Sequence, residues 1–411
     1  MGAPDLDSIL KKLEMRFSPG DVDRPYTVDE LGDGYRSLFY ISLVTTLLGL
    51  EAEMDADEGT KPYLTLVLME EPENHIAPQL LGRVLRILKE LGELPNVQVI
   101  LSSHTPAIVS RIEPEGIRHF RLDKTSHTTV AHRLLLPEKK DEAFTYVKEA
   151  VRNYPEIYFA KLVVIGEGDS EEVVFKRLMR AYDQDFDDHM ISFAPLGNRF
   201  VNHIWRLLSD LEIPYLTILD FDRERHGGGW GRIKYAIGQL LETGVEYDKL
   251  LEVAGKKTLS KQALKKMHEW PFDQPMQEAW IKYLRRYHVY FSYPLDLDFS
   301  LIEVFQEEYA TVIPKNGGPE IPHKSTHPTE YAEKRTSAIQ ATLKSEKATG
   351  ATYSEDQKDL MIWYNYHFLG RGKPSTHFLA LADIKDKQLL KKLPEPLKAL
   401  FGRIQKILET I

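Results

Sequence analysis

The sequence predicts an α/β protein built on parallel sheets, and three observations lead to this prediction. Short apolar runs alternate with segments of helical periodicity, which is typical of β-α-β units. Acidic residues directly follow several of these runs, as they do at the ligand-binding edge of open α/β sheets. A polar and mainly helical region replaces the alternation after residue 300. We therefore expect two α/β domains followed by a helical C-terminal region.

The composition bounds the class of protein. The 411 residues are enough for two or three domains with their own cores. Cysteine is absent from the sequence, which excludes disulfide scaffolds and thiolate metal sites and fits a reducing cytoplasm. We see no signal-peptide pattern and no apolar run of about 18 residues, so we expect a cytoplasmic protein without a membrane partner. The net charge of −9 argues against a generic DNA-coating protein but allows a nuclease with local basic groups.

The first predicted domain covers residues 1–150. Its expected elements are helices over 31–50, 78–91 and 105–112, buried strands over 63–69 and 97–101, and two short strands within 117–135. Glu70 and Glu71 follow the first buried strand, where ATPases place the carboxylates that hold Mg²⁺ and polarise water. His104 ends the next strand and is a candidate γ-phosphate sensor. Gly32 and Gly34 open the first helix, whose free N–H groups can receive phosphate oxygens.

The second predicted domain covers residues 151–300. Its expected elements are strands over 162–165, 192–195, 215–219 and 290–293, helices over 171–182 and 200–211, and a polar helical insert over about 232–284. Asp169 and Glu172 fit a capping box at the start of the first of these helices. A third region, residues 301–411, is expected to be helical and to supply Lys373.

Three acidic motifs lie at strand ends of this second domain. They are Glu167 with Glu171, Asp220 with Asp222, and Asp296 with Asp298. Because the carboxyl ends of parallel strands meet at one edge of a sheet, we expect these carboxylates to converge. Asp220 and Asp222 are two residues apart on a chain assumed to be extended, so they should point the same way and share one cation. Hard oxygen ligands suit Mg²⁺ or Mn²⁺, the metals of phosphodiester hydrolysis.

The order of the motifs in residues 1–150 resembles ABC-type ATPase heads of the SMC/Rad50-like group. Leu31–Tyr35 is similar to the signature motif, Glu70-Glu71 to the end of Walker B, and His104 to the switch histidine. Glu70 stands where the family has aspartate, and Gly32 where it has serine. The pattern G-x-x-x-x-G-K-[ST] of Walker A does not occur in the sequence. The resemblance implies only the C-terminal lobe of a head, with ATP bound only if a Walker A lobe is supplied and ATPase activity of this chain in doubt.

The later motifs resemble the Toprim domain, and an ATPase part followed by a Toprim part resembles the overcoming-lysogenisation-defect (OLD) family, including the nuclease subunit of the Gabija anti-phage system. The resemblance implies two divalent cations, one near Glu171, Asp220 and Asp222 and the other near Glu167, Asp296 and Asp298. Asp298 stands where the family usually has glutamate, so a water is expected to bridge it to the metal. Glu167 and Lys373 are implied to be catalytic, with Lys373 neutralising charge on the phosphate or the leaving oxygen.

The leading hypothesis is a metal-dependent DNA endonuclease that nicks or cleaves duplex DNA with metal-activated water. ATP would regulate the full-length protein, and the implied role is anti-phage defence as a homo-oligomer with a helicase-like or other defence partner. The alternative is an ATP-sensing or recombination and repair scaffold whose Toprim domain binds DNA without cleaving it. A topoisomerase, which needs a tyrosine nucleophile, ranks last. Arg223, Lys256 and Lys257 are candidate contacts to DNA phosphates.

Overall fold

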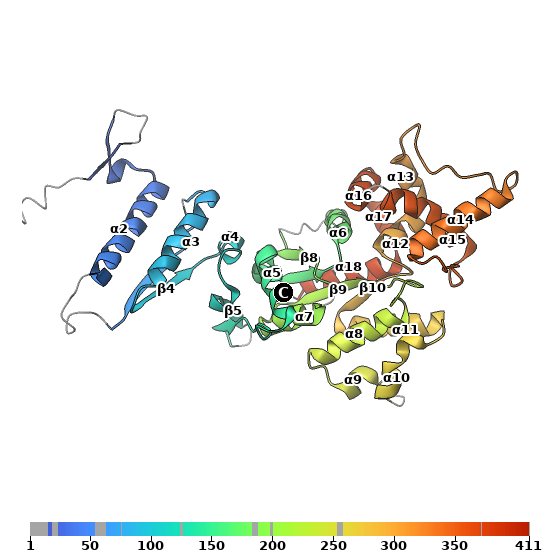
Figure 1. The fold of residues 1–411 in the computed structure, drawn as a ribbon, viewed down its shortest axis with the longest axis horizontal. Coiled ribbons are helices and arrows are strands. Elements are labelled where there is room, and N and C mark those ends of the chain that lie inside the picture. The colour runs from blue at the N-terminus through green and yellow to red at the C-terminus, as the bar shows by residue number, and fades with distance from the viewer. Residues whose placement is uncertain are drawn as a thin grey trace, which may run out of the picture. The chain divides into compact units, whose positions relative to one another are not determined.

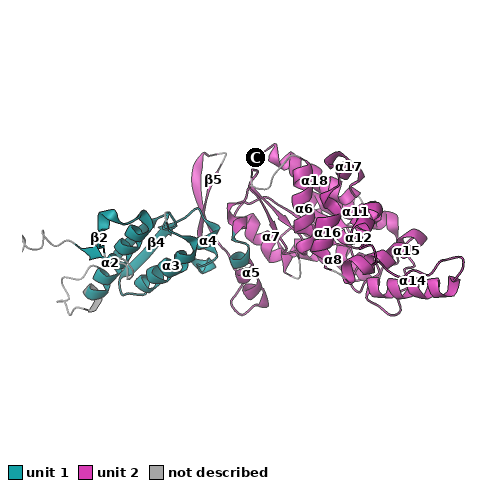
Figure 2. Cartoon of the chain, turned by 90° about the horizontal axis from the view of Figure 1, so that it is seen from above, with its two compact units in different colours: residues 1–117, 151–155 teal, residues 118–150, 156–411 magenta. Residues whose placement is uncertain are grey.

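The computed structural model describes residues 15–18, 24–53, 63–74, 76–123, 126–182, 188–197, 200–252, 258–370 and 372–410. The chain divides into two compact units, residues 1–117 with 151–155 and residues 118–150 with 156–411 (Figure 2). The division passes through helix α5 (Glu142–Asn153), which belongs in part to each unit. The expected division into residues 1–150, 151–300 and 301–411 stays a prediction.

The first unit is built on the parallel pair β3 (Thr65–Glu70) and β4 (Val97–Ser102). Alternate side chains of the pair, among them Met69, Val99 and Leu101, pack on a core that includes residues of α2 (Asp33–Glu53) and α3 (Pro78–Gly92). The predicted strands and long helices of this part are confirmed, with ends displaced by a few residues. This unit also contains β1 (Arg16–Phe17), β2 (Tyr26–Thr27), α4 (Pro106–Val109) and the short 3-10 helices Val28–Glu30 and Pro114–Gly116.

The second unit contains a four-stranded parallel sheet in the order β10-β9-β7-β8 (Figure 1). Its strands are β7 (Leu162–Ile165), β8 (Ile191–Ala194), β9 (Tyr215–Asp220) and β10 (Val289–Ser292). All four residues of the inner strand β7 are buried, as its continuous apolar sequence predicts. The sheet class and all four predicted strands are therefore confirmed.

Helices connect these strands and continue beyond them. The crossovers are α6 (Asp169–Ala181) and α7 (Val201–Asp210), and the hairpin β5 (Arg118–Asp123) and β6 (Thr128–Arg133) precedes them. The predicted insert forms α8 (Trp230–Glu242), α9 (Tyr247–Leu251), α10 (Lys261–Lys265) and α11 (Gln274–Leu284). The C-terminal helices are α12 (Leu297–Val304), α13 (Gln306–Thr311), α14 (Pro328–Leu343), α15 (Glu355–Tyr364), α16 (Lys373–Ala382), α17 (Asp386–Lys392) and α18 (Glu395–Leu408), with a short π-helix over Asn365–Leu369.

The C-terminal helices share one apolar core with the sheet. Phe401 of α18 meets Phe175 of α6 edge-to-face at 5.6 Å between ring centroids and stacks on Tyr182 at 5.4 Å. Aromatic pairs of this kind add about 1 kcal/mol each to the burial of their surface. The late part of the chain is thereby fixed against the strands that carry the acidic motifs.

The strand order creates a switch point between β7 and β9. From β7 the chain runs through α6 to β8 on one side, whereas β9 is followed by β10 on the other side. The connections leaving β7 and β9 diverge, and ligands of open α/β sheets bind in the crevice that forms at such a point. In the part of the chain that the structure describes, no helix is long and apolar enough to cross a bilayer.

Candidate functional site

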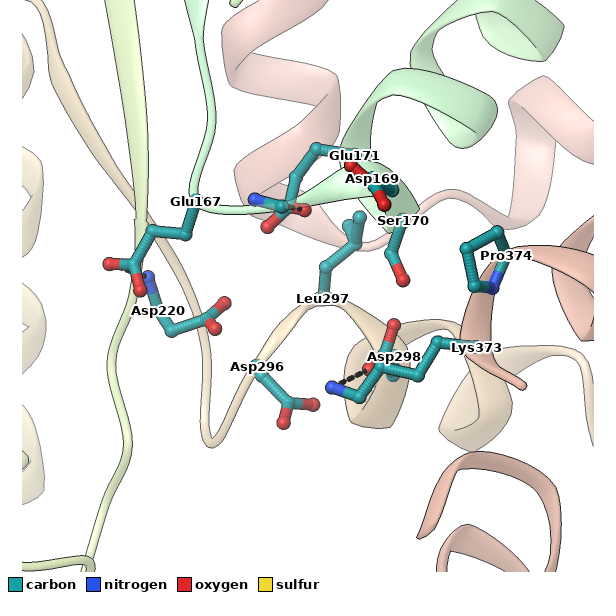
Figure 3. A pocket seen from close by; sticks show the side chains of 11 residues that line it. Glu167, Asp169, Ser170, Glu171, Asp220, Asp296, Leu297, Asp298, Lys373 and Pro374 are labelled. Atoms are coloured by element: carbon teal, nitrogen blue, oxygen red, sulfur yellow. Dashed lines mark hydrogen bonds and ion pairs between the residues drawn. The ribbon is translucent and has the colours of Figure 1, made fainter. Parts of the chain in front are cut away.

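A cavity of about 270 Å³ lies at this switch point (Figure 3). It is lined by Glu167, Gly168, Asp169, Ser170, Glu171, Asp220, Asp296, Leu297, Asp298, Lys373 and Pro374. Six of these eleven residues are acidic and only one is basic. The structure thus brings together five of the six predicted metal ligands and the predicted lysine around one space.

Strand ends place the first carboxylates of the site. Glu167 follows β7 by two residues, and Asp220 is the last residue of β9. The backbone N–H of Asp220 donates to Glu167 Oε1 at 3.1 Å, which fixes the two side chains across the switch point. Ser292 at the end of β10 pairs with Asp220 in register, so the loop after β10 starts at the same edge.

The third motif enters as a helix cap. Asp296 precedes α12, and its Oδ1 accepts the backbone N–H of Phe299 at 2.9 Å. A carboxylate at this position satisfies one of the free N–H groups of the helix. Asp298 lies in the first turn of α12 and is 2% exposed. The cap therefore turns both aspartates of this motif toward the sheet edge.

The turn after β7 is closely packed. A Cβ atom on Gly166 would lie 2.7 Å from the Phe193 ring and 3.0 Å from the Glu171 Cβ, so only glycine fits there. Glu171 Oε2 accepts the N–H of Gly168 at 3.1 Å. The predicted capping pair of Asp169 and Glu172 is wrong, because the N-cap of α6 is Gly168, one residue earlier, and Glu171 makes the capping contact.

Burial and mutual repulsion hold four of the carboxyl groups toward their neutral form. Burial, reinforced by the charge of Asp298, raises the pKa of Glu171 to about 8. Burial raises the pKa of Glu167 to about 6, although Arg232 opposes the shift. Burial and the neighbouring acidic groups also raise the pKa values of Asp220 and Asp296. These shifts indicate a site with more negative charge than its own cations compensate.

Asp298 behaves differently because it has cationic and hydrogen-bonding partners. Its Oδ2 lies 2.5 Å from Lys373 Nζ, and its Oδ1 lies 2.8 Å from His377 Nε2. Although burial acts in the opposite direction, these partners lower the pKa of Asp298 to about 2. The Asp298 charge in turn raises the pKa of Lys373 against the effect of burial. Lys373 is therefore held as a cation at the cavity.

Asp222 does not line the cavity, and the assumption of an extended backbone was wrong. Its φ of 52° lies in the left-handed region, so its side chain is not parallel to that of Asp220. It pairs instead with Arg225 at 2.7 Å and with Arg232 at 2.6 Å. Despite burial, these two guanidinium groups lower the pKa of the Asp222 carboxyl. The structure therefore does not support one cation shared by Asp220 and Asp222.

The donor chemistry of the cavity fits a hard divalent cation, although its side chains form no closed ligand set. In the described ranges, no three His, Cys, Asp or Glu side chains are arranged so that they could hold a metal ion. Arg225 pairs with Asp222 and Asp296, and Lys373 pairs with Asp298, so these three carboxylates are turned toward cationic side chains. However, Asp220 Oδ1 is buried and has no hydrogen-bond partner in the structure. A buried oxygen without a donor is what a cation requires.

The predicted contacts to DNA are not supported at Arg223. This side chain is only 4% exposed and lies over the rings of Phe272, Tyr293 and Tyr353, with centroid distances of 4.6–5.4 Å. Cation–π contacts and a hydrogen bond to Thr352 O draw this arginine inward, away from the position that a contact to DNA phosphate would need. Lys256 and Lys257 lie outside the described residues.

In the first unit, Glu71 and His104 are brought together. His104 Nε2 lies 2.9 Å from Glu71 Oε1, and Glu71 has a φ of 43°, which indicates local backbone strain. Glu70 is the last residue of β3. Gly32 and Gly34 line a separate cavity of about 420 Å³ at the start of α2, and Glu70, Glu71 and His104 are not among its lining residues. Their nucleotide-binding role stays a prediction.

Several residues at the second-unit site were not singled out by sequence reasoning. Arg232, Tyr364 and His377 contact the predicted carboxylates. His377 had a usable signal, because it lies one helical turn after Lys373 and hence on the same face of α16. Tyr364 had no such signal, since nothing in the neighbouring sequence distinguishes it from the chain's other tyrosines.

Fold and site together define a Toprim-type protein with a preceding ATPase-like part, and family comparison agrees. Residues 158–222 match the "Overcoming lysogenization defect protein-like, TOPRIM domain" family, and residues 6–109 match the "AAA ATPase domain" family. The chain is 25% identical to an OLD nuclease of Thermus scotoductus over 231 residues, 54% of this chain and 40% of that protein. It is 23% identical to endonuclease GajA of Bacillus cereus over 202 residues, 49% of this chain and 32% of that protein.

Part of the chain thus matches the OLD-like Toprim family, and the chain spans less than half the length of these two relatives. Solved structures that resemble it include the C-terminal region of the OLD protein of Xanthomonas campestris pv. campestris, with 14% identity and a TM-score of 0.33 over 61% of this chain and 98% of that one. The corresponding region from Burkholderia pseudomallei has 13% identity and a TM-score of 0.31 over 61% of this chain and 99% of that one.

Proposed function

We propose that this protein is a metal-dependent endonuclease that hydrolyses phosphodiester bonds of duplex DNA. The observation that carries the proposal is the cavity at the β7–β9 switch point, where six acidic residues and Lys373 surround one space. Relatives described as a nuclease and an endonuclease support the reaction class. Mg²⁺ or Mn²⁺ is the proposed cofactor because all the candidate ligands are hard oxygens.

Four residues of the site have a proposed part in the reaction. Glu171 and Asp220 would hold the cation, Asp220 through its unpartnered Oδ1. The bound cation would activate water and offset the charge of the phosphodiester. Glu167, with a pKa of about 6, is suited to accept a proton near neutral pH. Lys373, kept charged by Asp298, would stabilise negative charge on the phosphate or the leaving oxygen.

The test is incubation of supercoiled plasmid with the full chain and Mg²⁺ or Mn²⁺, with and without EDTA. We expect metal-dependent nicking or linearisation that EDTA abolishes. Asp220→Asn and Lys373→Ala should each lower the rate by about 100-fold or more, because each removes a charge from the reacting centre. Glu71→Ala is the matched acidic control. It should leave the rate of this chain unchanged, because Glu71 and its partner His104 both belong to the first unit and not to the unit that holds the cavity.

Two other results would replace the proposal. Intact plasmid with every metal, together with retention of DNA on a gel, would identify the non-cleaving recombination and repair scaffold. A covalent protein–DNA adduct would instead identify a topoisomerase with a tyrosine nucleophile. A large loss of rate in Glu71→Ala would mean that the ATPase-like unit controls the nuclease site in this chain.

We extend the proposal to the longer protein that the relatives suggest. There, ATP would bind with a phosphate-loop lobe and regulate cleavage, and the protein would act as a homo-oligomer in anti-phage defence with a helicase-like or other partner. The support is the ATPase match over residues 6–109. ATP turnover and plasmid cleavage, measured together on the chain extended to include a phosphate loop, test this part.

A further inference from the structure

Arg232 of α8 holds two carboxylates at one side of the site. Its Nη2 lies 3.1 Å from Glu167 Oε2 and 2.6 Å from Asp222 Oδ2, and its Nε lies 3.1 Å from the same Asp222 oxygen. The guanidinium thus bridges a residue after β7 and a residue after β9. Such a bridge places a fixed positive charge between the two strand ends.

Arg225 forms a second bridge from the same aspartate. Its Nη1 lies 2.7 Å from Asp222 Oδ1 and 3.2 Å from Asp296 Oδ2. Three carboxyl groups and two guanidinium groups therefore alternate, from Glu167 through Arg232, Asp222 and Arg225 to Asp296, with Asp222 at the centre. This row of five ionisable groups runs across the carboxyl ends of β7, β9 and β10.

The position of Arg225 does not depend on the carboxylates alone. Its Nε donates to the backbone oxygen of Thr342 at 2.9 Å, and its Nη2 donates to Tyr364 Oη at 3.1 Å. Its side chain is 10% exposed, and that of Arg232 is 23% exposed. Moving Arg225 away would break partly buried hydrogen bonds to neutral partners as well as ion pairs.

The other side of the cavity lacks such cations. Within the described residues, neither Glu171 nor Asp220 takes part in an ion pair, whereas Glu167, Asp222, Asp296 and Asp298 all do. Glu171 accepts the N–H of Gly168, and Asp220 Oδ1 has no hydrogen-bond partner in the structure. The demand for an added cation is therefore greatest between these two residues.

We infer that the site takes one divalent cation, at Glu171 and Asp220, and that the guanidinium groups of Arg225 and Arg232 stand where a two-metal nuclease holds its second ion. This inference rests on the proposed function. Two fixed cations beside one metal supply the positive charge that a pair of metals supplies. Asp222 is then a positioning residue that orients both arginines, and it does not bind metal.

The decisive measurement is the number of Mn²⁺ ions bound by the metal-stripped full chain, from equilibrium dialysis and the electron paramagnetic resonance signal of free Mn²⁺. We expect one ion, lost in Asp220→Asn. Two ions in the unaltered chain, both lost in a variant lacking Asp220 and Asp296, would overturn the inference and leave metal-dependent cleavage intact. No bound ion at any concentration would remove the proposed function itself.

Arg232→Gln tests the substitution of a guanidinium for a metal. This change frees Glu167 and one oxygen of Asp222, so a second and weaker Mn²⁺ should appear. Arg335→Gln is the matched control, because Arg335 also bridges two carboxylates, those of Glu355 and Asp359, but neither of these carboxylates lines the cavity. It should keep the count at one. A folded Arg232→Gln protein, checked by circular dichroism, that still binds one ion would contradict the inference.

Discussion

At the scale of single residues, the charge of Lys373 depends on a side chain outside the motifs. His377 is fully buried, and its two ring nitrogens contact Asp298 Oδ1 at 2.8 Å and Tyr309 Oη at 2.5 Å. Asp298 is thereby fixed so that its other oxygen meets Lys373. We infer that His377 acts through Asp298 as a positioning residue.

We predict that His377→Ala lowers both stability and cleavage. The change leaves a buried aspartate with one partner fewer, which costs about 3 kcal/mol of unfolding free energy. The pKa of Asp298 should rise from about 2, because the histidine hydrogen bond is among the causes of its low value. Urea unfolding gives the stability, and plasmid nicking gives kcat and KM, of which kcat should fall more.

Two further variants distinguish positioning from general damage. His377→Gln keeps a donor for Asp298 and should restore part of kcat. The exposed His323 lies in the same unit, and His323→Ala should change the unfolding free energy by no more than about 0.5 kcal/mol. Equal losses of kcat in the alanine and glutamine variants would argue against the positioning role.

Residue spacing predicted where the carboxylates gather but not how each one points. Glu167 and Asp220 follow directly from apolar strands, so their place at the sheet edge could be predicted from sequence. Asp222 could not, because its left-handed backbone and its two arginine partners are set by the tertiary structure. Arg223 shows the same limit, since its three aromatic neighbours lie far from one another in sequence.

We predict that Arg223→Ala destabilises the protein without weakening its contact with DNA. The change removes the cation–π contacts of the buried guanidinium and its hydrogen bond, which together stabilise the fold by about 2 kcal/mol or more. Arg286 is the matched control, an exposed arginine over the single ring of Tyr283, and Arg286→Ala should cost less than about 1 kcal/mol. Thermal melts and the salt dependence of DNA binding check both parts. If DNA binding depends less steeply on salt in Arg223→Ala than in the unaltered chain, Arg223 contacts a DNA phosphate and this prediction is wrong.

At the scale of elements, the turn between β7 and α6 determines the shape of the site. We predict that Gly166→Ala costs about 1–3 kcal/mol, because the new methyl group would overlap the Phe193 ring and press on Glu171. Gly238→Ala is the matched control within α8, where no heavy atom lies within 4 Å of the added Cβ. It should stabilise the protein by about 0.5–1 kcal/mol. Denaturant unfolding measures both, and similar signs would contradict the packing argument.

Element types were predictable where the hydrophobic pattern was long and regular. The four predicted apolar strands correspond to β7, β8, β9 and β10, and no strand end differs from its prediction by more than one residue. The π-helix over Asn365–Leu369 was not predictable, because its sequence has no distinct propensity. It directly follows Tyr364, whose hydroxyl meets Asp296, so an irregular element lies next to a site residue.

At the scale of the whole molecule, burying so many carboxyl groups links stability to pH. A glutamate in the unfolded chain loses its proton near pH 4.5, whereas Glu171 in the folded chain keeps its proton up to about pH 8. Between these values the folded state binds more protons, so stability falls as pH rises, by up to about 1.4 kcal/mol per pH unit for each such group. Burial raises the pKa of Asp220 as well, so it adds to the same trend.

A divalent cation should reverse this trend, and that is the prediction at this scale. The cation binds the charged carboxylates of the folded state and displaces their protons, so its stabilising effect grows with pH. We therefore expect Mg²⁺ to raise the melting temperature of the full chain more at pH 8 than at pH 6, with EDTA removing the difference. Glu171→Gln should flatten the pH dependence without metal and weaken the effect of Mg²⁺. An Mg²⁺ shift of the same size at both pH values would show that these buried carboxyl groups are not its ligands.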